Sequence, residues 1–127
     1  MIVFDVEADG LFRQATKIHC LSKLLSIKIK AKLYDTLAMS WVINTDRPKH
    51  GLESFGEDFG IPKPVVTDWE SQDIQVYIHR CEEDVKINWM LWSNLIQRFM
   101  LVYKSKENLD KYLRYLSFKM QCAFRAE

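Results

Sequence analysis

Residues 2–11 have the sequence IVFDVEADGL, and this stretch decides the predicted fold. Within residues 2–7, apolar side chains fall on both faces of an extended chain, which is typical of an interior strand of an α/β sheet. The dipeptide Asp9-Gly10 then favours a turn. Two further strands are expected, over residues 17–22 and over residues 26–33, where apolar residues alternate with lysines.

Beyond these strands, apolar residues recur at the three- and four-residue spacing of helices. Asp35 stands where an N-cap is expected, before a helical run that reaches Ile43. A short amphipathic helix is predicted over residues 52–59, and Gly60 supplies its C-terminal stop. The following stretch, residues 62–69, contains two prolines and is expected to be extended or looped.

Two more helices are predicted in the second half of the chain. The first runs from Ser71 to Phe99, with a bend before Cys81, and the second runs from residue 109 to residue 120. Together with the strands they predict one α/β domain over residues 1–127, in which helices pack on a small mixed sheet.

The composition narrows the class of protein. The chain has 127 residues, the size of one domain, and a net charge of +1, so affinity for nucleic acid would have to come from a local patch. Its three cysteines form no C-x-x-C pair, which favours reduced thiols in the cytoplasm. Because no apolar run approaches the roughly 20 residues of a membrane span, no membrane partner is expected.

Three acidic residues are the candidates for chemistry. Asp5 and Glu7 are two apart, so both carboxylates lie on one face at the end of the first strand. Two adjacent anions repel unless a cation neutralises them, which favours a divalent metal bound by hard oxygen ligands. Asp84 lies beside the apolar residues of the long helix and can point inward. The alternative for all three is an ordinary solvated acid.

The segments IVFDVEADGL, YDTLAMSW…HGLESFGEDFGIPK and RCEEDVKIN occur in this order. Together they resemble the exonuclease domains of phage family A DNA polymerases, in the DEDD, or DnaQ-like, superfamily. The resemblance covers nearly the whole chain and implies a ribonuclease H-like fold in a shortened form. Residues 109–127 also resemble the start of the connection to a downstream polymerase domain.

The resemblance implies a metal site and names its ligands. Asp5 and Glu7 match the first acidic motif of the family, and Asp84 matches the third, so these three residues would bind Mg²⁺ or Mn²⁺. The second acidic motif has no match in this chain, and we expect the second metal of a two-metal site to be held weakly. Asp35 is the nearest substitute, although its N-cap role is the stronger interpretation.

A general base is also implied. In the histidine branch of this superfamily, a His lies five residues before the last Asp, and His79 has that spacing from Asp84. The tyrosine branch places a Tyr four residues before that Asp, where this chain has Arg80. Five residues along an unbroken helix put two side chains on different faces, so His79 serves only if the helix begins or bends near it. An exposed or core-edge histidine is the alternative.

The function that follows from the resemblance is 3′–5′ hydrolysis of DNA, as in a proofreading domain. A single-stranded or frayed 3′ end is the expected substrate, because its terminal phosphodiester must reach the metal. The alternative is a catalytically inactive remnant that binds nucleic acid or oligomerises. A homodimer through exposed sheet edges is a third expectation, since unpaired edges invite pairing with another chain.

Overall fold

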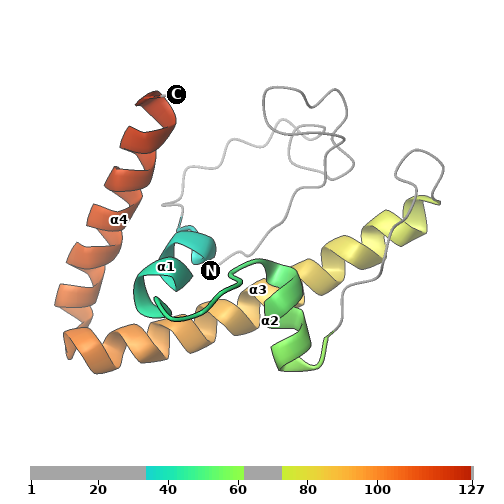
Figure 1. The fold of residues 1–127 in the computed structure, drawn as a ribbon, viewed down its shortest axis with the longest axis horizontal. Helices are drawn as coiled ribbons and strands as arrows, with labels where there is room; N and C mark the ends of the chain where they lie inside the picture. Colours follow the sequence, from blue (N-terminus) through green and yellow to red (C-terminus); the bar gives the residue numbers. More distant parts are fainter. Residues whose placement is uncertain (1–33, 62–72, 127) are drawn as a thin grey trace.

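The computed structural model describes residues 34–61 and 73–126, and every regular element in these two segments is an α-helix (Figure 1). The helices are α1 (Thr36–Ile43), α2 (Leu52–Phe59), α3 (Ile74–Tyr103) and α4 (Lys106–Ala126). The predicted α/β class, a small mixed sheet in a ribonuclease H-like fold, is wrong for the described residues, since these contain no strand. The predicted strands at 2–7, 17–22 and 26–33, and the segment 62–69, lie outside the described residues.

The physical reason for this correction is what covers the apolar face of α3. We expected that face to cover a sheet, but α1, α2 and α4 pack against α3 instead. Apolar side chains from all four helices meet in one buried cluster, which a helix-on-helix arrangement can close without a sheet. Its buried members are Met39, Phe55, Ile87, Leu91, Leu95, Phe99, Leu109 and Leu113.

The two short helices begin and end as their sequences predict. The Asp35 carboxylate caps α1 by accepting hydrogen bonds from the backbone N–H of Leu37, at 2.8 Å, and of Ala38, at 3.3 Å. Gly60 ends α2 in the left-handed conformation, with φ 70°, and its N–H donates to the carbonyl of Glu57. Both predictions are confirmed, because each depends only on local backbone chemistry.

The long helix α3 carries four of the eight buried residues of this cluster and runs without interruption over 30 residues. Asp73 caps its start by accepting a hydrogen bond from the N–H of Gln75 at 3.2 Å. At its end Lys104 adopts the left-handed conformation, with φ 60°, and donates its N–H to the Met100 carbonyl. The predicted bend before Cys81 is absent, since the helix is continuous there (Figure 1).

α4 turns sharply away from the end of α3 (Figure 1). The turn is packed by three aromatic rings: Tyr103 stacks on Tyr112 with centroids 4.7 Å apart, and Phe99 lies 5.5 Å from Tyr112. Leu109 and Leu113 anchor the first half of α4 in the core. The single domain over residues 1–127, and the connection toward a polymerase domain at residues 109–127, both stay predictions.

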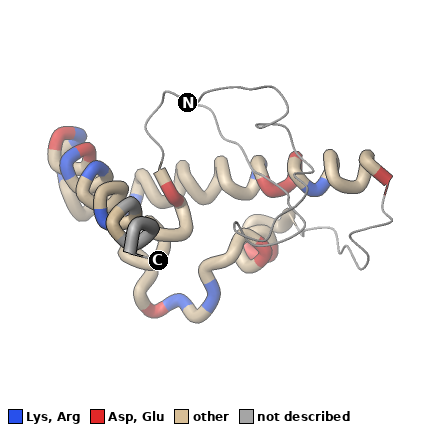
Figure 2. Tube along the Cα trace, turned by 90° about the horizontal axis from the view of Figure 1, so that it is seen from above, with Lys and Arg blue, Asp and Glu red and all other residues tan. Residues whose placement is uncertain are grey.

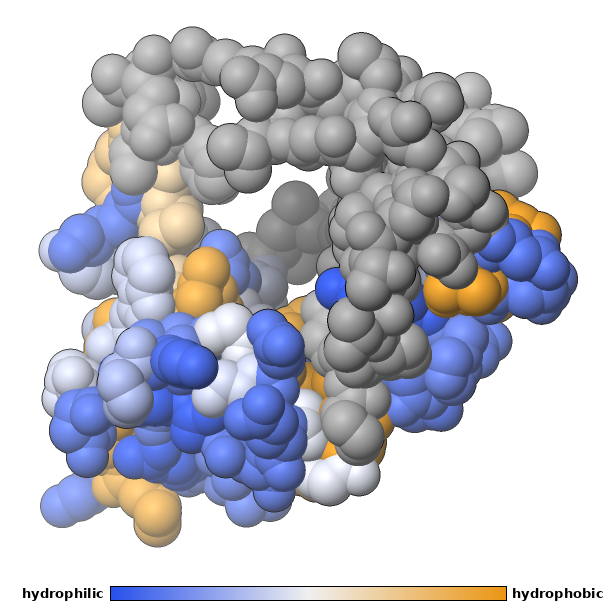
Figure 3. Space-filling model, turned by 45° about the vertical axis from the view of Figure 1, so that its right-hand side comes forward, coloured by the Kyte–Doolittle hydropathy of each residue, from blue (hydrophilic) through white to orange (hydrophobic). Residues whose placement is uncertain are grey.

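The described surface is mixed in character. On the face seen in Figure 3, hydrophilic residues predominate and exposed apolar residues form small, separate patches. None of the described helices has the length and apolar character needed to cross a membrane.

Candidate functional site

Of the two predicted site residues that the structure describes, Asp84 lies in the interior and His79 does not. Asp84 lies on the buried side of α3 with only 2% of its surface exposed. Its neighbours on that side are Tyr77, seven residues earlier, and Ile87 and Leu91, three and seven residues later. We expected Asp84 beside the apolar stripe, whereas it lies within the stripe. A buried carboxylate is costly unless a cation or hydrogen bonds compensate for lost hydration.

The turn of α3 that follows Asp84 is held by both short helices. Thr36, at the start of α1, donates its hydroxyl to the side-chain oxygen of Asn88 at 2.7 Å. Ile87, the residue before Asn88, packs against Gly56 of α2. The two are so close that a Cβ added to Gly56 would lie 2.9 Å from Cδ1 of Ile87. These two contacts fix the rotation of α3 about its axis, and hence the direction in which Asp84 projects.

The two acids beside Asp84 do not join it. Glu83 pairs with Lys86, one turn further on, with 2.6 Å between the ammonium and the carboxylate. The hydrogen bond that Lys86 donates to the Glu83 carboxylate, together with the negative charge of Glu83, raises the pKa of Lys86. Glu82 is exposed. The run of three acids therefore places Asp84 in the interior and Glu82 on the surface, while Glu83 is largely covered, with 14% of its side chain exposed beside Lys86.

His79 does not meet Asp84 on this helix. Its side chain is exposed, and α3 begins five residues before it, at Ile74, without a break in between. Five residues of α-helix rotate a side chain by about 140° relative to Asp84. The condition under which His79 would act as general base is therefore not met by the described helix, and that role stays an untested prediction.

The other two predicted ligands, Asp5 and Glu7, lie outside the described residues. Within residues 34–61 and 73–126, no three His, Cys, Asp or Glu side chains gather closely enough to bind a metal. Asp35 is engaged as the cap of α1. The described part of the chain thus supplies one of the three predicted ligands, Asp84, and leaves the complete ligand set untested.

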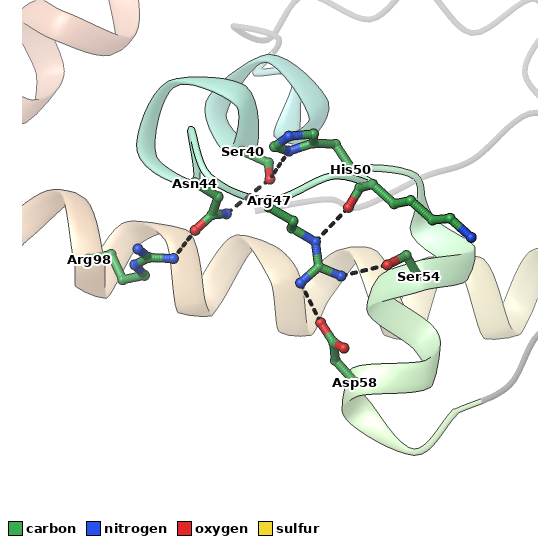
Figure 4. Close-up of polar contacts among 8 residues, drawn as sticks. Ser40, Asn44, Arg47, His50, Ser54, Asp58 and Arg98 are labelled. Atoms are coloured by element: carbon green, nitrogen blue, oxygen red, sulfur yellow. Dashed lines mark hydrogen bonds and ion pairs between the residues drawn. The ribbon is translucent and has the colours of Figure 1, made fainter.

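A buried polar chain links α1 to α3 and was not anticipated from the sequence (Figure 4). The Arg98 guanidinium donates to the side-chain oxygen of Asn44, and the Asn44 amide donates to the Ser40 hydroxyl at 3.0 Å. The Ser40 oxygen lies 2.9 Å from Nδ1 of His50. Although a Ser–His pair is the core of many hydrolytic sites, Ser40 is fully buried and no substrate can reach it. This series of hydrogen bonds between α1 and α3 therefore has a structural role.

A second polar group, centred on Arg47, fixes the loop between α1 and α2 (Figure 4). Its guanidinium pairs with Asp58 at 2.6 Å and donates to the Ser54 hydroxyl at 2.7 Å. It also lies over the ring of Phe55, 4.0 Å from the centroid. No sequence pattern predicts this group, because the partners of a loop arginine depend on how the chain folds back.

Comparison with known proteins adds no family to this description. No protein-family model, no curated protein and no solved structure matches the chain. The resemblance to phage polymerase exonuclease domains therefore stays a prediction that rests on the segments quoted above.

Proposed function

We propose that this chain is a metal-dependent 3′–5′ exonuclease module that acts on DNA 3′ ends, with Asp5, Glu7 and Asp84 as ligands of Mg²⁺ or Mn²⁺. The observation that carries the proposal is the burial of Asp84 within the apolar stripe of α3. The sequence resemblance assigns a metal to this same residue. A cytoplasmic location and a downstream polymerase domain belong to the same proposal.

The placement of Asp84 supports a ligand role on physical grounds. The stripe continues through Ile87, Leu91 and Leu95, so an apolar residue at position 84 would complete it. A carboxylate at this position loses hydration on burial, and this loss must be offset by hydrogen bonds or by a cation. A divalent cation bound by carboxylate oxygens would offset that loss.

The chemistry would follow from the metal and its ligands. A cation held by these carboxylates would supply Lewis-acid chemistry, which would activate a water molecule and stabilise the leaving 3′ oxygen. Asp5 would contact both metals, and Glu7 and Asp84 would each hold one. With three carboxylates instead of four, the second metal binds weakly, so we expect slow cleavage that requires high Mn²⁺ or Mg²⁺. The proposal assigns no proton transfer to His79.

A cleavage assay with matched variants tests the proposal. The substrate is a single-stranded DNA labelled at its 5′ end, so that removal of 3′ nucleotides produces a ladder in the presence of Mn²⁺. Asp84→Asn and Asp5→Ala should abolish the ladder, because each removes a ligand. Glu82→Gln, which changes an exposed acid on the same helix, and His79→Ala should both leave it intact.

Metal binding provides a second measurement that does not depend on turnover. Mn²⁺ should raise the melting temperature of the wild-type protein and of Glu82→Gln, because a cation that binds only the folded state stabilises it. The Asp84→Asn protein should show no such rise. If Asp84→Asn and Glu82→Gln behave alike in both experiments, the metal assignment is wrong. The chain is then a non-catalytic remnant.

A further inference from the structure

We infer that the exposed face of α4 binds single-stranded nucleic acid, on a surface separate from the proposed metal ligands. This face, called here the α4 outer face, consists of Lys111, Tyr115, Phe118, Lys119 and Cys122. Steps of three and four residues place these positions on one side of the helix. Leu109 and Leu113 occupy the buried side. The inference stands independently of the nuclease proposal.

Two aromatic rings on this face are open to solvent. Tyr115 is 56% exposed and Phe118 is 61% exposed, although large apolar side chains are normally covered where a helix packs against its own domain. An exposed ring offers a flat surface on which a nucleic-acid base can stack, and stacking of this kind tolerates any base sequence. Two rings one turn apart could receive two bases of an unpaired strand.

The charge of this part of α4 fits a polyanion. Between residues 111 and 126 the sequence contains no Asp or Glu, and its basic residues are Lys111, Arg114, Lys119 and Arg125. Figure 2 shows such basic positions along α4. The helix dipole favours cations in the last turn only, so it does not account for Lys111, Arg114 or Lys119.

The present contacts of Lys111, Arg114 and Lys119 would not prevent these side chains from binding phosphate groups. The Lys119 ammonium lies 5.7 Å from the centroid of the Tyr115 ring, which places a charge beside the stacking surface. Lys111 pairs with Glu107 at 2.8 Å, and Arg114 pairs with Asp110 on the flank of the face. All four of these side chains are more than a third exposed, and such surface pairs contribute little energy, so exchanging a carboxylate for a phosphate is easy.

Charge also selects among the partners that could cover the two rings. A second copy of this chain, pairing through the same face, would bring Lys111 and Lys119 of one copy close to those of the other, and such like-charge contacts are unfavourable. A nucleic-acid strand supplies the opposite charge together with planar bases. The α4 outer face is therefore complementary to a single strand rather than to itself.

Binding is measured by fluorescence anisotropy with a fluorescein-labelled oligo-dT, in EDTA so that no metal-dependent cleavage occurs. The double variant Tyr115→Ala/Phe118→Ala should weaken binding about tenfold or more for each ring removed. Lys119→Glu should weaken binding and should reduce the slope of log affinity against log salt concentration by about 1. The control is Leu101→Ala, which removes a large apolar side chain that is 79% exposed, more than any other among the described residues, from α3 instead of α4. It should bind as wild type does.

The thiol of Cys122 gives a readout on the unaltered protein. This residue is exposed on the same face, so bound oligo-dT should slow its alkylation by a maleimide, as measured by peptide mass spectrometry. Failure of the wild-type protein to bind oligo-dT at low salt would overturn the inference. So would unchanged Cys122 alkylation, or equal losses in the double variant and Leu101→Ala.

Two further results separate this inference from other readings. If light scattering shows that Tyr115→Ala/Phe118→Ala converts a dimer to a monomer while oligo-dT affinity is unchanged, the face is an interface between copies and the inference is wrong. Asp84→Asn should bind oligo-dT as tightly as wild type. Loss of cleavage in Asp84→Asn with retained binding would therefore support both proposals, and loss of binding in it would contradict the separation of the two surfaces.

Discussion

Replacing Gly56 with Ala should destabilise the protein, against the usual preference of helices. Gly56 lies inside α2, where Ala would ordinarily be favoured by about 1 kcal/mol because Gly loses more backbone freedom on folding. Here, however, an added Cβ would overlap the carbonyl oxygen of Ile61 and would lie 2.9 Å from Cδ1 of Ile87. Both distances are shorter than those real Cβ atoms adopt.

The size of the effect follows from what can move. The Ile61 oxygen belongs to the backbone, and the Ile61 N–H donates to the Gly56 carbonyl at 2.8 Å, so relief would disrupt the C-terminal end of α2. Ile87 is fully buried and cannot swing into solvent. Overpacking costs about 1–3 kcal/mol, and a clash with backbone that cannot move belongs at the upper end of this range. After subtraction of the helix preference of about 1 kcal/mol, a net loss of about 2 kcal/mol remains.

Urea unfolding followed by tryptophan fluorescence measures this difference. A loss of about 2 kcal/mol should lower the urea midpoint by about 1 M while the slope is unchanged. Gly51→Ala is the control, because Gly51 has no atom within 4 Å of an added Cβ and its φ of −67° suits any residue. Its effect should stay near 1 kcal/mol or less. A Gly56→Ala protein as stable as wild type would refute the packing of α2 on α3.

Three other predictions concern the α3–α4 corner and the buried polar chain. Lys104→Gly should raise the urea midpoint, because a residue with a Cβ at φ 60° costs about 1 kcal/mol relative to Gly; an unchanged or lower midpoint would contradict the left-handed turn. Burial, together with the charge interaction and the hydrogen bond of Tyr103, raises the pKa of Tyr112 from 10.0 to about 12. The unfolded chain therefore loses this proton first, stability falls as pH rises from 10 toward 12, and Tyr112→Phe should lessen that fall in urea unfolding. Asn44→Ala should cost about 1–3 kcal/mol by leaving buried groups without partners, whereas Asn94→Ala, on the exposed side of α3, should cost little.

Local signals predicted the ends of the short helices well. The cap at Asp35 and the stop at Gly60 are confirmed because a capping carboxylate and a left-handed glycine act within a few residues of themselves. The left-handed Lys104 carried no such signal, since lysine is not a residue that favours this conformation. A helix end can therefore be predicted from the sequence where a single residue type favours the conformation found there.

The buried face of α3 was harder to predict, because its sequence contains two apolar stripes. One passes through Ile74, Ile78 and Val85, and the other through Ile87, Leu91 and Leu95, about 120° around the helix from the first. The stripe predicted from helical spacing ran from Ile74 and Ile78 through Val85 to Leu95 and Phe99, and so crossed from one stripe to the other. Its last two members are buried, but Ile74 is 55% exposed and Ile78 is 40% exposed. Periodicity alone gives equal support to both stripes, and the choice between them depends on where α1, α2 and α4 pack.

The buried position of Asp84 also depends on which of the two stripes of α3 faces the other helices. Because Ile87 and Leu91 form the buried side of α3, the acid one turn before Ile87 is carried inward. The contact of Ile87 with Gly56 sets this rotation of α3. Overpacking at Gly56 should therefore turn Asp84 away from its buried position and reduce Mn²⁺ stabilisation as well as stability. A Gly56→Ala protein that loses stability but retains the full Mn²⁺-induced rise in melting temperature would show that the ligand role of Asp84 does not depend on the packing of α2.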